Sequence, residues 1–138
     1  MHQQPVSLQE VMASWRSATL ERWEQEWQSA QVGEWTHTLF PTVRDRLALQ
    51  HLTPTFWTSQ ALSGHGVFRA YLASRGQSTS AACPCGFGPE TAEHVLTECP
   101  RFTDGRPLDW TPLSLHNLPY MEKMVRGLWK LENPSFPG

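Results

Sequence analysis

A series of mostly apolar side chains recurs at nearly every fourth position near the amino terminus. The series comprises Leu8, Met12, Trp15, Thr19, Trp23 and Trp27. This spacing places them on one face of an α-helix. Ser7 and Glu10 have the form of a capping box, and Gly33 follows as a stop. The pattern predicts a helix from Ser7 to about Ala30, whose aromatic stripe lies in the core or packs on a neighbouring domain.

Shorter helical patterns follow in the middle and at the carboxyl end of the chain. Thr53-Pro54 combines a capping hydroxyl with a proline suited to the first helical position, which predicts a short helix that ends at residues 63–66. A second short helix is predicted over 67–74, and Leu118-Pro119 opens a last one. The apolar positions of that last helix are Met121, Met124, Val125, Leu128 and Leu131. Residues 34–41 are rich in β-prone side chains before a proline and predict a short strand or extended linker.

The charge balance limits how the chain could contact nucleic acid. It has 11 basic and 13 acidic side chains, which excludes a protein that coats nucleic acid by bulk charge. Between Leu47 and Pro89 there is no acidic residue, whereas Arg69 and Arg75 lie there. Any contact with nucleic acid is therefore expected to be local.

The chain also lacks the sequence features of membrane and secreted proteins. No apolar run approaches the ~18 residues of a membrane span, and the first seven residues do not form a secretory signal. We expect an intracellular protein, nuclear or cytoplasmic, that contacts no membrane.

All three cysteines fall within 17 positions, together with a histidine, in the order Cys83, Cys85, His94 and Cys99. Three thiolates and one imidazole are a ligand set of tetrahedral structural zinc. Gly86 and Gly88 allow the chain to turn back after the first pair, and Pro89-Glu90-Thr91 resembles a helix start. The spacing predicts a zinc knuckle over 83–99 that binds Zn²⁺ in a structural role.

Two other interpretations of these residues are open. The cysteines could be small buried apolar side chains with His94 as a core residue. Alternatively, Cys83 and Cys85 could form a redox pair, although they precede a turn rather than a helix start. The one-residue spacing of that pair is also tighter than the usual two residues.

The familiar signatures of catalysis are missing. The chain has no phosphate-binding glycine loop with lysine, no Gly-x-Ser-x-Gly and no His-Glu-x-x-His. His65 lies in a glycine-flanked turn with no carboxylate near it in sequence. We therefore predict no catalytic residues and no enzymatic activity for this chain by itself.

Together these features predict a mainly α fold, a small helical domain with a Cys/Cys/His/Cys zinc knuckle. We divide it into a Trp-rich helix and extended connector (1–50), a helical core with the knuckle (51–106), and a loop with a carboxyl-terminal helix (107–138).

Several segments resemble the region carboxyl-terminal to the reverse transcriptase in polyproteins of non-LTR (LINE-type) retrotransposons. The segments are 23–27, 33–36 with Leu39 and Pro41, 58–72, 83–85, 90–96 and 98–102. The Gln-x-Leu-Ser-Gly-His-Gly run and the Glu-Thr-Ala-Glu-His run are the most specific parts. The resemblance implies a zinc knuckle formed by Cys83, Cys85, His94 and Cys99, and a role in gripping RNA or DNA during target-primed reverse transcription. Polyproteins of the family that this chain resembles are RNA-directed DNA polymerases that also carry an endonuclease, and the catalytic motifs of these two activities have no counterpart in this sequence.

Three hypotheses of function follow from the residues and the resemblance. In the first, a non-catalytic module binds RNA or DNA through local contacts of five side chains. These are Arg69, Arg75, Arg101, Arg106 and His65. In the second, zinc holds a protein-interaction module whose Trp15/Trp23/Trp27 face docks on the reverse transcriptase body or another protein. In the third, the chain is a non-functional transposon fragment.

Overall fold

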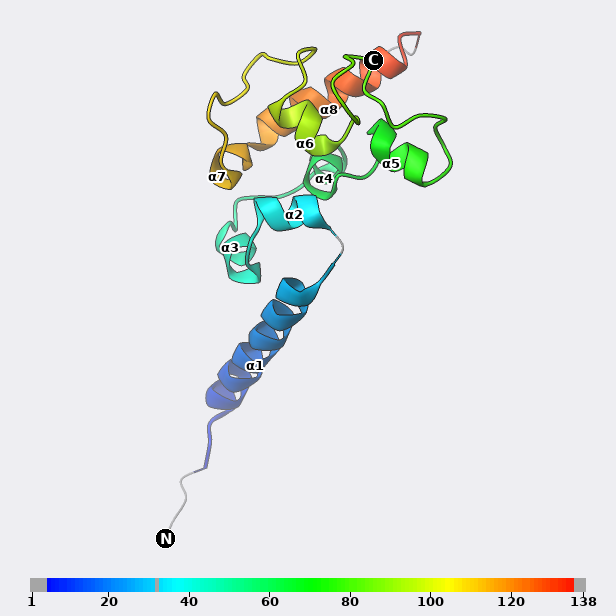
Figure 1. Ribbon diagram of the computed structural model, residues 1–138. Coiled ribbons are helices and arrows are strands. Elements are labelled where there is room, and N and C mark those ends of the chain that lie inside the picture. Colours follow the sequence, from blue (N-terminus) through cyan, green and yellow to red (C-terminus); the bar gives the residue numbers. More distant parts are fainter. Residues whose placement is uncertain (1–4, 32, 136–138) are drawn as a thin grey trace.

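The computed structural model describes residues 5–31 and 33–135, which form eight helices and no strand (Figure 1). The helices are α1 (Leu8–Ser29), α2 (Glu34–Leu39), α3 (Val43–Ala48), α4 (Phe56–Ser63), α5 (Arg69–Ser74), α6 (Ala92–Thr97), α7 (Pro112–Leu115) and α8 (Leu118–Glu132). The prediction of a mainly α fold is therefore confirmed. None of the helices in the described part is long and apolar enough to cross a membrane.

Helix α1 projects away from the other helices, which gather at its carboxyl end (Figure 1). The predicted capping box is present, with Ser7 Oγ accepting from Glu10 N at 3.1 Å and the Glu10 carboxylate accepting from Ser7 N. No residue of α1 is buried, and Trp15 is 70% exposed. Of the two placements predicted for its stripe, the one in the core is therefore wrong for most of the stripe, while packing on a neighbouring domain stays a prediction. Only the last turns are anchored, since Trp27 Nε1 donates to Phe40 O at 2.9 Å.

The core lies among α2, α4, α6, α7 and α8, and it draws residues from all three predicted segments. Its buried members are Leu39, Phe40, Leu52, Ala61, Leu62, Phe68, Ala92, Val95, Leu96, Leu115, Tyr120, Met121, Met124, Val125 and Leu128. The last helix was predicted correctly, with four of its five apolar positions buried. Leu131, in the last turn of α8, is the exception and is 56% exposed.

Residues 34–39 form helix α2, so the predicted strand or linker is wrong. Trp35 Nε1 donates to Ala61 O at 2.8 Å, and Thr36 Oγ1 donates to Leu62 O at 2.8 Å. Leu39 is fully buried at the end of the helix. These contacts with the end of α4 outweigh the weak local preference of Trp and Thr for strands.

The start of α4 also differs from its prediction by two residues. The N-cap is Thr55 rather than Thr53, and Thr55 and Thr58 cap one another reciprocally in a box that lacks a carboxylate. The predicted stop is correct, because Gly64 adopts a left-handed conformation at φ 76°. At Gly66 a Cβ would lie 2.2 Å from Gln60 Oε1, the atom that accepts from Val67 N. Only glycine therefore allows this side chain to close the turn.

Candidate metal centre

The four predicted ligands come together at one end of α6. Cys83 and Cys85 lie on a turn closed by Cys83 N, which donates to Gly88 O at 2.8 Å. Gly86 and Gly88 both adopt positive φ there, as the predicted turn requires. Thr91 caps α6 by accepting from His94 N at 3.1 Å. His94 therefore lies on the helix and Cys99 just beyond it, as the spacing predicts.

The ligand atoms are close enough to share one metal ion. All four lie within 4.8 Å of one another. Cys83 Sγ is 3.7 Å from Cys99 Sγ, and Cys85 Sγ is 3.2 Å from His94 Nε2. Ligands about 2.0–2.3 Å from a tetrahedral ion lie roughly 3.3–3.8 Å apart. The donor chemistry and the separations therefore fit zinc.

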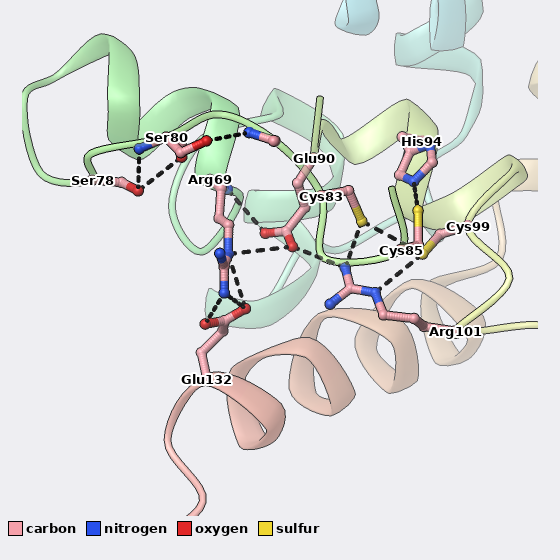
Figure 2. Close-up of polar contacts among 11 residues, drawn as sticks. Arg69, Ser78, Ser80, Cys83, Cys85, Glu90, His94, Cys99, Arg101 and Glu132 are labelled. Atoms are coloured by element: carbon pink, nitrogen blue, oxygen red, sulfur yellow. Dashed lines mark hydrogen bonds and ion pairs between the residues drawn. The ribbon is translucent and has the colours of Figure 1, made fainter. Parts of the chain in front are cut away.

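A partly buried arginine, Arg101, lies against this thiol-rich cluster and offsets its negative charge. Arg101 Nη2 donates to Cys83 Sγ at 3.0 Å, and Arg101 Nε donates to Cys99 Sγ at 3.2 Å (Figure 2). Three thiolates, a neutral imidazole and a zinc dication carry a net charge of −1, which one guanidinium balances. Such outer contacts orient metal ligands and tune their basicity.

The pKa values of the thiols reflect burial and the arginine together. Burial raises the pKa of the Cys83 thiol to about 12. At Cys99 burial acts in the same direction, but hydrogen bonds from Arg101 outweigh it and hold the pKa below its ordinary value. The pKa of Arg101 is raised, because its contacts with Cys99 and Glu90 exceed the cost of burial. The site therefore favours a thiolate at Cys99 beside a charged guanidinium.

Glu90 extends this arrangement to helix α8. Its fully buried carboxylate accepts from Arg101 Nη2 at 2.8 Å and from Arg69 N at 3.0 Å. The Arg69 guanidinium in turn forms a bidentate pair with Glu132, at 2.8 and 2.9 Å (Figure 2). A continuous chain of charges thus joins the metal ligands to the last turn of α8.

The sequence did not indicate this role of Glu90 and Glu132. Glu90 is the first acidic residue after the acid-free stretch and falls inside the knuckle, which is the only signal that could have singled it out. Glu132 has no such signal, since it is separated from Arg69 by 63 residues.

The five side chains predicted to contact nucleic acid have different surroundings. Arg69 and Arg101 take part in the ion pairs described above, and Arg106 Nη2 donates to Val95 O at 3.0 Å and Cys99 O at 2.7 Å. Arg75 is exposed beyond α5. His65 is exposed and stacks on Tyr71, with ring centroids 4.3 Å apart.

Comparison with known proteins gives relatives that align with about two thirds of this chain. A Pol polyprotein of the type-1 retrotransposable element R1 4 from Nasonia vitripennis is 36% identical over 95 residues, which is 68% of this chain. R1 Pol polyproteins from Bradysia coprophila and Popillia japonica are 32% identical over 98 residues and 33% identical over 91 residues. Over this region the chain is a homologue of R1 retrotransposon Pol polyproteins. The resemblance drawn from the motifs is thus confirmed.

The aligned region spans only part of each R1 polyprotein. It covers 24% of the Nasonia protein, 10% of the Bradysia protein and 35% of the Popillia protein. No protein-family model matches the chain, and no solved structure matches it.

Proposed function

We propose that this R1 homologue is a non-catalytic, zinc-stabilised module that binds RNA or DNA during target-primed reverse transcription. The observation that carries the proposal is the Cys/Cys/His/Cys cluster, in a chain of which about two thirds aligns with R1 Pol polyproteins. Four protein ligands complete a tetrahedron and leave no open position for substrate or water. Bound zinc would therefore hold the fold, with Cys83, Cys85, His94 and Cys99 as its ligands.

Within this proposal the five predicted side chains divide into two groups. Arg75 and His65 are exposed, with His65 stacked on the half-buried Tyr71, and they would contact the strand directly, by charge and by base stacking. Arg69, Arg101 and Arg106 donate to internal acceptors and would contribute mainly to the local electrostatic potential.

Metal content is the first test. Native mass spectrometry of the purified chain should show one zinc that is lost on chelation, and His94→Ala should lack it. His51→Ala is the matched control, because His51 is exposed and lies outside the cluster. A metal-free chain that is nonetheless stably folded would contradict the zinc site.

Salt dependence tests the binding role. Affinity for a single-stranded RNA or DNA oligonucleotide should fall with salt at a log–log slope of about −0.7 per phosphate contact, which gives roughly −1.5 to −3 for two to four contacts. The zinc-free His94→Ala variant should bind at least several-fold more weakly than His51→Ala. Absence of binding by the zinc-loaded chain at low salt would refute the role.

The exposed face of α1 supports a second candidate function, docking on protein. Trp15 is 70% exposed and Trp23 is 47% exposed, which is unusual for such large apolar side chains. Trp23 and Trp27 also line a mainly apolar groove of about 290 Å³ that continues over α3 and α4. Its partner would be the reverse transcriptase body of the same polyprotein.

Binding to a separately produced reverse transcriptase domain tests this second function. Affinity should be almost independent of salt, because it rests on apolar burial rather than on phosphate contacts. It should be lost in Trp15→Ala/Trp23→Ala and retained in the exposed-polar control Gln9→Ala/Gln25→Ala. Failure of both the strand and the protein tests would leave the third hypothesis, a non-functional transposon fragment.

A further inference from the structure

A further basic surface borders Arg101, between the segment that follows the knuckle and helix α8. A groove of about 610 Å³ separates residues 101–104, which follow the knuckle, from the outer face of α8. Lys123, Arg126 and Lys130 line its α8 side. They are spaced three and four residues apart, so they follow one helix face over about 10.5 Å. The chain has only two lysines, and both lie in this groove.

The acidic residues of the groove only partly offset these charges. Lys123 pairs with Asp104, and Arg126 Nη1 lies 3.8 Å from Glu122 Oε2. Both pairs are exposed, and exposed pairs contribute little and are readily exchanged. Lys130 has no ion pair within the described part of the chain. With Arg101 included, the groove carries four basic and two acidic side chains.

The groove also presents an aromatic surface. Phe102 lines it with its ring partly exposed, and the Arg101 guanidinium lies 5.1 Å from the ring centroid. The ring lies directly against α8, since a Cβ built at Gly127 would be in ordinary van der Waals contact with Phe102 Cε1, at 3.6 Å. A flat aromatic ring beside a row of cations is how proteins bind single strands without sequence preference.

We propose that this α8 groove binds the phosphate backbone of single-stranded RNA or DNA, with Phe102 beside the bases. The inference rests on the proposed function and assigns to it a surface that sequence reasoning did not find. An acidic peptide would use the same cations, but it offers no planar group to Phe102 and leaves the ring's role without explanation.

Neutralising the three α8 cations tests the proposal. At 0.1 M salt each phosphate contact raises the affinity by a factor of roughly five. The triple variant Lys123→Gln/Arg126→Gln/Lys130→Gln should therefore weaken oligonucleotide binding about 100-fold. It should also reduce the log–log slope of affinity against salt by about 2. The matched control Arg16→Gln/Arg22→Gln/Arg44→Gln removes the same net charge from exposed positions on α1 and α3. It should weaken binding less than about three-fold. Zinc content and helical circular dichroism verify that both variants fold.

A variant that is expected to tighten oligonucleotide binding distinguishes an effect on binding from an effect on folding. Asp104→Asn/Glu122→Gln releases Lys123 and Arg126 from their ion pairs and should tighten binding several-fold, which a folding defect could not do. If the wild-type chain binds the oligonucleotide but both groove variants match it, the groove assignment is wrong while the proposed function stands. If the wild-type chain binds no oligonucleotide, both the groove assignment and the proposed function are wrong. Tighter binding of a poly-glutamate peptide than of the oligonucleotide also overturns the assignment.

Discussion

Glu90 is the residue on which the charge balance beside the metal site depends. Its carboxylate is fully buried between Arg101 and Arg69, so replacing it leaves two guanidinium groups without their shared partner. We expect Glu90→Gln to lower the free energy of unfolding by about 3 kcal/mol, because breaking a buried ion pair strands its charges. Urea denaturation measures this. Exposed Glu93 is the control, and Glu93→Gln should change stability by less than about 0.5 kcal/mol.

Tyr120 makes a pH-dependent contribution of its own. Its hydroxyl donates to Leu96 O, and burial raises its pKa above the ordinary value of 10. A group with a raised folded pKa stabilises the fold fully below the unfolded pKa and loses this effect as the pH rises through the folded value.

We therefore expect Tyr120→Phe to be less stable than the wild type by about 1 kcal/mol at pH 7, the net value of one hydrogen bond. Above pH 10 the difference should shrink toward zero or reverse, as measured by urea denaturation across pH. The control Tyr71→Phe removes the chain's other phenol. A Tyr120→Phe difference that stays constant to pH 12 would contradict the assignment.

At the residue scale the sequence predicts the clustering of the four candidate ligands well and the charged residues that support them poorly. Cys83, Cys85, His94 and Cys99 are close in the chain, and one turn and one short helix bring them together, so local spacing was sufficient. The pair between Arg69 and Glu132 depends instead on how α5 packs beside the end of α8. No local pattern encodes that contact.

At the scale of elements, prediction succeeded where a long apolar repeat or a local capping residue is sufficient to define the helix. Helices α1 and α8 have long repeats and local caps, and both were found. Helix α2 was missed because hydrogen bonds to the end of α4 decide its conformation. Helices α3 and α7 have only six and four residues, too few for a period to show.

The attachment of α1 gives a prediction at the same scale. Trp27 is half-buried, donates to Phe40 O, and contacts the His37 ring in a tilted arrangement with ring centroids 3.9 Å apart. Trp27→Ala should lower stability by about 2 kcal/mol, somewhat less than a fully buried tryptophan, whereas Trp15→Ala should leave it within about 0.5 kcal/mol. Thermal denaturation compares the two. Equal losses would mean that the stripe is buried along its whole length.

At the scale of the molecule, charge is distributed so that a nucleic acid would not be repelled from the folded body. The first 31 residues contain four acidic and two basic side chains, which accounts for the whole net charge of −2. The remaining residues carry no net charge, and the groove on α8 concentrates positive charge among them. A near-neutral chain can thus bind phosphate locally, and the excess negative charge lies on the projecting helix.

The metal site and the core should also unfold together. Val95 and Leu96 of α6 are fully buried against the core that α8 completes, and Glu90 joins the ligands to α8 through Arg69. Because zinc binding supplies folding free energy, chelation should expose amides in α8 as well as in the knuckle. Hydrogen exchange should therefore show faster exchange over 83–102 and 118–132 together. Residues 9–22 of α1 should exchange at an unchanged rate, and an α8 that keeps its protection would make the knuckle an independent unit.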